Sequence, residues 1–238
     1  MKQNRKPGIF YLALLSAVLL LSIAGVAEAR KSHRHNADIG GLLVDSSQFD
    51  YFLLALSWSP EFCDSPQGAQ AGKRVQCSSR LGFVVHGLWP QLIHKPYPHD
   101  CGAEAEVPAD VAETVWRANP PMPPGDMGLL RHEWSKHGTC SGLSMAQYFS
   151  AVKASAEKVK IPEKFKAPQT AINLQAQEVV DAFAAENPGL QAGMINVDSD
   201  RQGNISAVQI CFSKQLVFQP CPDGRRLKGG TLLPVIKP

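Results

Sequence analysis

The chain has 238 residues, of which 44% are hydrophobic and 19% are charged, and its formal net charge is +3. This composition excludes an intrinsically disordered chain, and the length suits one domain with a sizeable core. The small net charge also excludes a broad basic surface for non-specific nucleic-acid binding, so a nucleic-acid substrate would need a compact site.

Residues 1–29 have the pattern of a cleaved signal peptide. Lys2, Arg5 and Lys6 precede a long apolar run, which ends at the small-residue sequence Ala-Glu-Ala at residues 27–29. An uncleaved membrane anchor is the alternative, because the run is almost long enough to span a bilayer. The sequence turns polar immediately afterwards, which favours cleavage. We therefore expect a periplasmic or secreted monomer with no stable membrane association.

After this segment, residues 30–47 form a polar stretch that we expect to be a mobile lead-in, and residues 48–238 are expected to form a single domain. Apolar, aromatic-rich runs predict strands at 48–63, ending at Pro60, and at 80–91. Residues 91–107 are a loop rich in proline and histidine. Amphipathic patterns and end signals predict helices at 108–119, 126–138, 144–160 and 170–189.

Three more strands are predicted near the C-terminus, at residues 194–199, 204–213 and 215–222. Strands and helices do not alternate regularly, which favours an α+β fold with a central, mainly antiparallel sheet and flanking helices. The six cysteines are an even number in an exported chain, which predicts three disulfides. Spacing alone does not decide how the cysteines pair.

The segment "HEWSKHGTC", residues 132–140, concentrates chemically useful side chains. On a helical wheel, His132, Glu133, Lys136 and His137 share one arc. The two histidines are five residues apart and diverge by about 140°, which disfavours a shared metal ion, since a two-histidine zinc motif needs a spacing of four. Imidazoles beside a carboxylate and an ammonium suit acid/base chemistry at a phosphoryl group. The alternative is a solvated helix face.

A further histidine, His86, follows an apolar strand in "FVVHGLWPQ". A strand can deliver such a residue to the edge of a site, where a second imidazole would complete an acid/base pair. A histidine satisfied within the core is the alternative, and ordinary packing is the alternative for the neighbouring Trp89.

Together, "HGLWP" at residues 86–90 and "HEWxKHGTC" at 132–140 resemble the two active-site signatures of the ribonuclease T2 family. "FDYFLLALSWSPEFC" resembles the first core strand of the family and "ICFSKQLVFQPCP" its C-terminal strand pair. The resemblance covers roughly residues 48–223, and the short core is similar to that of the bacterial members.

The resemblance implies a metal-independent endoribonuclease that needs no cofactor and cleaves single-stranded RNA through a 2′,3′-cyclic phosphate. His137 would be the general base for the ribose 2′-hydroxyl, and His86 the general acid for the leaving 5′-oxygen. Glu133 and Lys136 would stabilise the charged phosphorus, and His132 would bind phosphate or position the substrate. Because DNA lacks the 2′-hydroxyl, only RNA would be cut.

The resemblance also implies substrate-binding residues. Trp89 matches a position that stacks on a base, and Tyr97 is a further candidate for stacking. Gln91 stands where the family often has an acidic residue that helps to select adenine, so we expect broad base specificity.

The family's central disulfide implies the pair Cys101–Cys140. A second pair, Cys211–Cys221, would close the last hairpin, and Cys63–Cys77 is the pair that remains, unless those two cysteines stay reduced. Two other functions stay open, namely a catalytically silent RNA-binding relative and a zinc-dependent hydrolase.

Overall fold

A computed structural model describes residues 36–39, 42–45, 49–70, 75–94, 96–222 and 226–235. The predicted signal peptide lies outside these residues. Part of the predicted lead-in is described, and there β1 (Asn36–Ile39) pairs antiparallel with β2 (Leu42–Asp45). Within the described ranges, no helix has both the length and the apolar character that crossing a bilayer demands.

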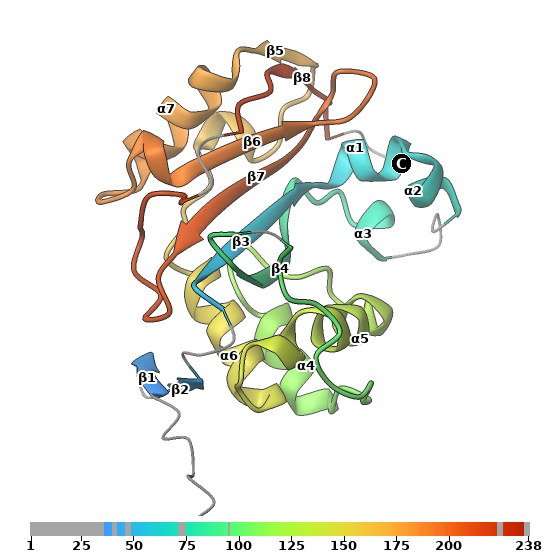
Figure 1. The fold of residues 1–238 in the computed structure, drawn as a ribbon. Helices are drawn as coiled ribbons and strands as arrows, with labels where there is room; N and C mark the ends of the chain where they lie inside the picture. The colour runs from blue at the N-terminus through green and yellow to red at the C-terminus, as the bar shows by residue number, and fades with distance from the viewer. Residues whose placement is uncertain are drawn as a thin grey trace, which may run out of the picture. The chain divides into compact units, whose positions relative to one another are not determined.

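A four-stranded antiparallel sheet forms the centre of the described structure (Figure 1). Its strand order is β4 (Phe83–Gln91), β3 (Tyr51–Trp58), β7 (Ile205–Phe212) and β6 (Ile195–Ser199). A separate two-stranded sheet joins β5 (Ile172–Leu174) to β8 (Gly230–Leu232). The sheet and its surrounding helices confirm the predicted α+β class.

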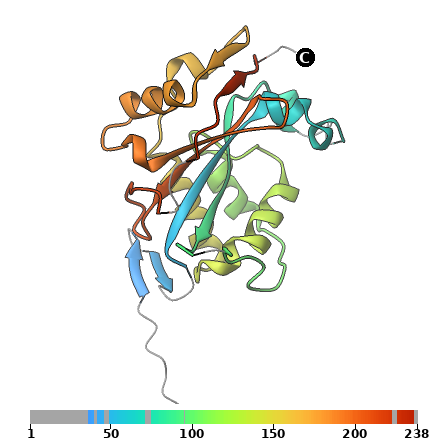
Figure 2. The same ribbon diagram turned by 45° about the horizontal axis from the view of Figure 1, so that its top comes forward.

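The helices lie in three groups around this sheet, and Figures 1 and 2 show α4, α5 and α6 together on the side of β4. Helix α7 contacts β6, and α1 follows directly from β3. The helices are α1 (Ser59–Asp64), α2 (Pro66–Gln70), α3 (Val75–Ser78), α4 (Ala109–Trp116), α5 (Met127–Lys136), α6 (Met145–Ala156) and α7 (Ala176–Glu186), with short 3-10 turns η1 (Gly138–Cys140), η2 (Glu163–Phe165) and η3 (Ala192–Met194).

The strand β3 is buried on both faces of the sheet. Alternate residues of a strand point to opposite sides, so the buried side chains of β3 fall into two groups. Phe52, Leu54 and Leu56 belong to the main apolar core, which the helices cover. Tyr51 and Leu53 belong to a smaller cluster on the other face, which includes the cysteines of the C-terminal disulfide and is packed against Trp89. This second, thinly covered face carries the pocket described below.

Two predicted elements change their type of secondary structure at one end. The strand predicted up to Pro60 ends at Trp58, and residues 59–64 are helical, because proline fits the first turn of a helix, where no N–H is needed. The helix predicted from residue 170 begins only at Ala176, after a capping box formed by Gln175 and Glu178. The preceding residues 172–174 pair with β8 instead.

The strand predicted at residues 215–222 is wrong. Strand β7 is already paired with β3 on one edge and with β6 on the other, so a hairpin partner has little free edge to join. Within the described part of this segment, pairing is limited to an isolated bridge between Phe212 and Phe218, beyond a tight turn in which Leu216 has a φ of 55°. Two prolines at positions 220 and 222 also lack the N–H that a ladder needs.

Three disulfides join Cys63 to Cys77, Cys101 to Cys140 and Cys211 to Cys221, which are the expected pairs. The central one links the loop after β4 to the end of the α5–η1 segment. Its two cysteines are 39 residues apart in the sequence. In the chain-entropy model, closing a loop of this length stabilises the fold by about 3–4 kcal/mol.

Candidate active site

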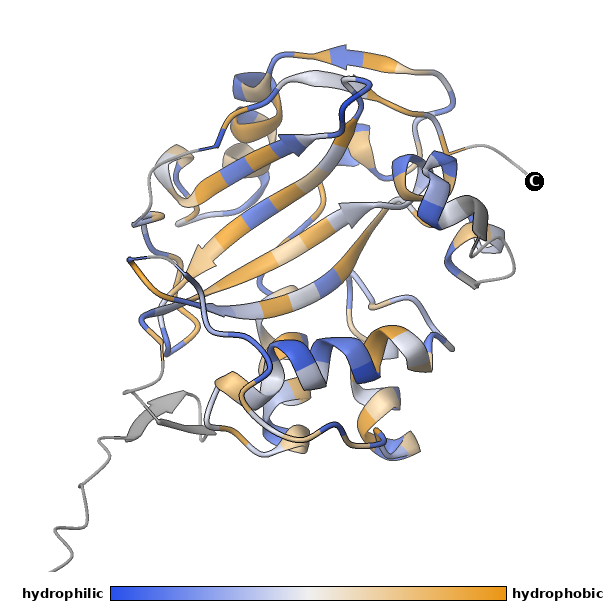
Figure 3. Cartoon of the chain, turned by 45° about the vertical axis from the view of Figure 1, so that its right-hand side comes forward, coloured by the Kyte–Doolittle hydropathy of each residue, from blue (hydrophilic) through white to orange (hydrophobic). Residues whose placement is uncertain are grey.

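Helix α5 presents a polar surface beside β4. Its first turn is capped by Asp126, whose side chain accepts a hydrogen bond from the backbone N–H of Leu129 at 2.9 Å. The helix passes from hydrophobic residues to the hydrophilic run Arg131–His132–Glu133, which Figure 3 shows as a change from orange to blue along the helix. It ends at Lys136, slightly earlier than predicted, and His137 is its C-cap.

Gly138 directly follows the C-cap His137, and the structure leaves no room for a side chain at this position. A Cβ at this position would lie 2.5 Å from the Trp134 ring and 2.9 Å from the Tyr148 ring. The residue is therefore needed for close packing of the chain end against two aromatic side chains. That packing fixes the backbone that carries His137.

His86 lies where the ladder between β3 and β4 shifts register, opposite the step from Ala55 to Leu56. Its imidazole is held on both sides. Nδ1 lies 3.1 Å from the hydroxyl of Ser57, and Nε2 lies 3.2 Å from Oε1 of Glu133. The side chain keeps 38% of its surface exposed, so it remains accessible to a ligand.

Glu133 lies beneath His86 with only 1% of its side chain exposed. The indole N–H of Trp89 donates a hydrogen bond to Oε2 at 2.8 Å. Gly87 makes room for the carboxylate, because a Cβ there would lie only 1.9 Å from the same oxygen. Burial by itself raises the pKa of the Glu133 carboxyl, but the hydrogen bond and charge of His86 outweigh it and hold the pKa below its usual range.

The same contact acts in the opposite direction on His86. Burial lowers the pKa of the imidazole, but the hydrogen bond and negative charge of Glu133 raise it by more, so the pKa of His86 lies above its ordinary value. The contact therefore favours the imidazolium form of His86 together with the carboxylate form of Glu133.

His137 has a different environment. Its side chain is buried and stacks on the indole of Trp89, with ring centroids 5.2 Å apart and an interplanar angle of 27°. Burial lowers the pKa of His137 to about 4, although Glu133 acts against this, and the positive charges of Lys136, His132 and His86 lower it further. His137 is therefore neutral at pH 7 and free to accept a proton.

One pocket of about 410 Å³ brings these groups together. Seven of the eight predicted catalytic and substrate-binding residues line it, and the eighth, Glu133, lies underneath. The lining residues are Leu53, His86, Trp89, Gln91, Tyr97, His132, Lys136, His137 and Arg226. A pocket of this size holds a small ligand such as a nucleotide.

Two of the predicted base-binding residues, Tyr97 and Gln91, differ in how far they are exposed in this pocket. Tyr97 is 39% exposed, and its ring centroid is 6.5 Å from that of His137. Gln91 is buried, and its amide donates a hydrogen bond to the carbonyl of Pro90 at 3.0 Å. The loop that carries Tyr97 is tied to the end of α5, because the N–H of Asp100 donates to the carbonyl of Lys136 at 2.9 Å.

Sequence reasoning gave no role to Ser57, Gly87 and Arg226. Ser57 and Gly87 support His86 and Glu133 as described above; Ser57 lies in a strand predicted as an apolar run, and Gly87 lies within the "HGLWP" motif. Arg226 lines the pocket from beyond the last cysteine. Its only signal in the sequence is a short basic run, which does not say where the side chain lies.

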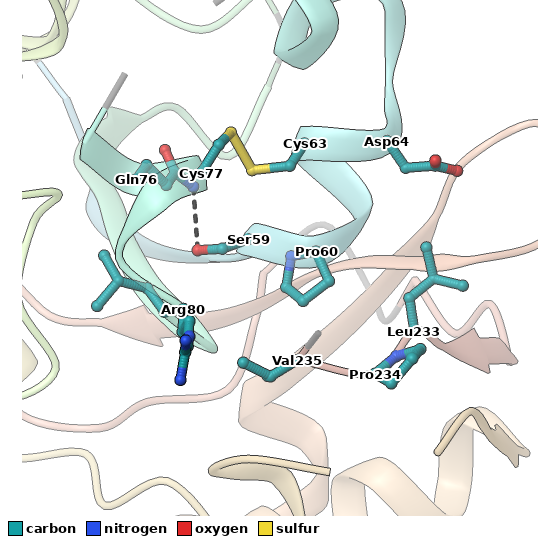
Figure 4. A pocket seen from close by; sticks show the side chains of 11 residues that line it. Ser59, Pro60, Cys63, Asp64, Gln76, Cys77, Arg80, Leu233, Pro234 and Val235 are labelled. Carbon is teal, nitrogen blue, oxygen red and sulfur yellow. Dashed lines mark hydrogen bonds between the residues drawn. A yellow bond between two sulfur atoms is a disulfide. The ribbon is translucent and has the colours of Figure 1, made fainter. Parts of the chain in front are cut away.

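Figure 4 shows another pocket, of about 460 Å³, beside α1 and the Cys63–Cys77 disulfide. Its lining includes Arg80 and residues 233–235, and the amide of Gln76 donates to the hydroxyl of Ser59 at 3.1 Å. The described residues that line it include no histidine, lysine or glutamate. The groups suited to proton transfer are gathered in the smaller pocket.

Metal-ligand geometry gives no further site in the part of the chain that is described. No group of three or more His, Cys, Asp or Glu side chains there could hold a metal ion. His132 and His137 were predicted to point in different directions from the helix. Their ring centroids are 6.4 Å apart, and the rings are nearly perpendicular.

The model of the Ribonuclease T2 family matches residues 49–221, which include both motif segments and most of the chain. The chain belongs to this family. A protein named ribonuclease from Aeromonas hydrophila is 45% identical over 104 residues, covering 44% of this chain and 43% of that protein. A probable ribonuclease from Haemophilus influenzae is 30% identical over 183 residues, covering 72% of this chain and 61% of its own length. The chain thus spans about half the length of these relatives.

Solved structures give the same fold. RNase NT in complex with 5′-AMP aligns with a TM-score of 0.55 and 24% identity, over 78% of this chain and 98% of that chain. A point mutant of RNase MC1 in complex with 5′-UMP aligns with a TM-score of 0.56 and 20% identity, over 78% and 98% of the two chains. The fold of this T2 family member is therefore that of known ribonucleases.

Proposed function

We propose that this protein is a metal-independent endoribonuclease that cleaves single-stranded RNA by transphosphorylation and leaves 2′,3′-cyclic phosphate ends. One observation carries the proposal. Two histidines with opposite pKa shifts, His86 raised and His137 lowered, line one pocket, and both of their rings pack against Trp89. Family membership and the ribonuclease names of its relatives support the same activity.

In this mechanism His137, neutral at pH 7, takes the proton from the ribose 2′-hydroxyl. The resulting oxygen attacks phosphorus, and the bond from phosphorus to the 5′-oxygen breaks. His86, as imidazolium, gives its proton to that leaving oxygen. Each acid or base contributes about 10²- to 10⁴-fold to the rate.

The remaining polar groups act on charge and position. Lys136 and His132 line the pocket, where their donors can bind phosphoryl oxygens and balance the negative charge that develops. A direct contact between Glu133 and phosphorus stays a prediction. Its burial and its contacts instead support an action through His86, which it keeps protonated, and through Trp89, which it holds in place.

Base binding is proposed for Trp89 and Tyr97 by stacking, which accepts any base. Gln91 is held by its own backbone neighbour and carries no charge, which supports broad base specificity. We also propose that residues 1–29 are removed during export and that the mature enzyme is a periplasmic or secreted monomer. The names of relatives do not decide the compartment, since both an intracellular and an extracellular tomato ribonuclease are among them.

The mature protein should be incubated with single-stranded RNA in excess chelator, and the product ends identified by mass spectrometry. The proposal expects cleavage with 2′,3′-cyclic phosphate ends and no cleavage where the 2′-hydroxyl is replaced by hydrogen. Binding without cleavage would instead indicate a catalytically silent relative. Cleavage that the chelator abolishes would indicate a metal-dependent hydrolase.

A further inference from the structure

Arg226 is a cation in the catalytic pocket that the motifs do not include. It lies beyond residue 221, where the family match ends, yet it lines the same pocket as His86 and Trp89. It reaches the pocket from the segment after the last disulfide, whereas the catalytic groups come from β4 and from α5 with its C-cap.

The edge strand β6 fixes the backbone of this segment. The N–H of Val197 donates to the carbonyl of Arg226 at 2.8 Å, and the N–H of Lys228 donates to the carbonyl of Val197 at 2.9 Å. The backbone N–H of Arg226 also donates to the side chain of Asn196 at 2.9 Å. The guanidinium is oriented by Gln209, whose side-chain oxygen accepts a hydrogen bond from Nη2.

Among the described residues, the cations around Arg226 outnumber the carboxylates that contact them. Asp198 lies 3.7 Å from Nε of Arg226 and 4.0 Å from Nζ of Lys228, so one carboxylate serves two cations. Nε is buried without a hydrogen-bond partner among the described residues, while 41% of the side chain as a whole remains exposed. Among the described residues, Gln209 and Asp198 contact the Nη2 and Nε side of the guanidinium, and the Nη1 end is the side that we expect to meet a ligand.

We propose that Arg226 binds a phosphate of the RNA next to the scissile one, and this rests on the proposed function. The scissile phosphate belongs beside His86, Lys136 and His137. Arg226 lies in the same pocket of about 410 Å³ but beside a different strand, so we expect it to contact the RNA at a neighbouring nucleotide. A guanidinium carries only donors, in a planar fork that matches a phosphate. The surplus positive charge favours an anion over a base.

A flanking phosphate contact makes the enzyme sensitive to substrate length. A dinucleoside monophosphate has only the scissile phosphate, so it cannot use Arg226. The same dinucleotide with an added 5′- or 3′-terminal phosphate can use it on the side where the contact lies. A residue that only supports the fold would affect both substrates equally.

The test compares kcat and KM of the unmodified protein and Arg226→Gln on ApU, pApU and ApUp. We expect Arg226→Gln to raise KM about tenfold for one of the two extended substrates, with kcat and the kinetics on ApU nearly unchanged. Arg226→Lys keeps the positive charge but loses the planar fork, so its KM for that substrate should lie between the values of the unmodified protein and of Arg226→Gln. Arg117→Gln removes an exposed arginine at the end of α4, outside the pocket, and should change the kinetics on none of these substrates.

Two kinetic results would overturn the proposal. One is an equal loss by Arg226→Gln on ApU and on both extended substrates, and the other is unchanged kinetics of Arg226→Gln on both extended substrates. Calorimetric binding of the matching 2′-deoxy compounds separates this inference from the activity. If the unmodified protein binds the extended deoxy dinucleotide more tightly and Arg226→Gln does not, the phosphate contact stands even where cleavage is absent. Equal binding would refute it.

Discussion

Two glutamates in different regions of the molecule have pKa values shifted in opposite directions. Glu133, beneath the catalytic pocket, is buried against His86 and Trp89, and its pKa is lowered. Glu61, on α1 at the C-terminal end of β3, is partly buried and faces Asp200 and Asp64, and its pKa is raised to about 7. Burial disfavours the charge in both places, so the neighbouring groups decide which carboxyl stays ionised.

The comparison has a functional meaning. In the proposed mechanism, the carboxylate of Glu133 pairs with the imidazole of His86 and favours the proton that His86 gives to the leaving oxygen. The carboxyl of Glu61 meets other carboxylates, so near neutral pH it keeps the proton itself or adds repulsion. In the proposed mechanism one region uses a buried glutamate to organise the reaction, whereas in the other region we expect a similar residue to make stability depend on pH.

The largest effect is expected where the catalytic region loses an imidazole. His86→Ala or His137→Ala should each lower kcat by about 10²- to 10⁴-fold, because each removes one proton-transfer group. Initial rates on a dinucleotide, with circular dichroism to verify the fold, provide the measurement. Turnover close to that of the unmodified protein by either variant would contradict the assigned roles.

A smaller effect is expected when the charge of Glu133 is removed with little change in shape. Glu133→Gln should lower kcat/KM roughly 10- to 100-fold at pH 7, because His86 loses the charged partner that keeps it protonated. The profile of kcat/KM against pH should rise as His137 loses its proton, near pH 4, and fall as His86 loses its own. In the variant, the falling side should move to lower pH.

Glu113→Gln is the matched control, since Glu113 is an exposed glutamate on α4 that is paired with Arg117. It should leave both sides of the pH profile in place. If Glu133→Gln lowered the rate equally at all pH values, Glu133 would not be acting through the proton of His86.

The smallest effect is expected at Glu61. The folded protein binds more protons than the unfolded chain between the ordinary pKa of 4.5 and about 7, so the free energy of unfolding should fall as pH rises through this window. Glu61→Gln should remove that fall and stabilise the protein at pH 8 by about 1 kcal/mol or less, allowing for solvent screening. Chemical denaturation at pH 5 and pH 8 measures it, and an unchanged pH dependence would show that Glu61 is not the group responsible.

Local patterns predicted much of the fold. Apolar runs located the strands that became β3, β4 and β7, and Ser144 marked the start of α6 through a capping box with Gln147. The strand expected at residues 215–222 failed because strand pairing is not local. Whether such a run becomes a strand depends on a free sheet edge, and β3 and β6 already occupy both edges of β7.

The site, like the fold, could be predicted only where the signal is local in the sequence. A helical wheel gives the direction of Glu133 relative to His132, but it does not say that β4 packs over that side and buries the carboxylate. Likewise, the contact of Ser57 with His86 depends on a register shift between two strands. Arg226 depends on where the chain returns after the last disulfide. These features arise from tertiary packing, which short motifs do not encode.

The disulfide between Cys101 and Cys140 makes the structure of the pocket depend on whether the chain has been oxidised. It joins the loop that carries Tyr97 to the segment just after His137, so the pocket acquires its covalent brace only after the chain meets an oxidising environment. With the proposed export, a newly made chain in the reducing cytoplasm would lack this disulfide, so its site would be incompletely held while it can still meet the RNA of the producing cell. Comparing cleavage rates of reduced and oxidised protein would measure how strong this safeguard is, and equal rates would show that there is none.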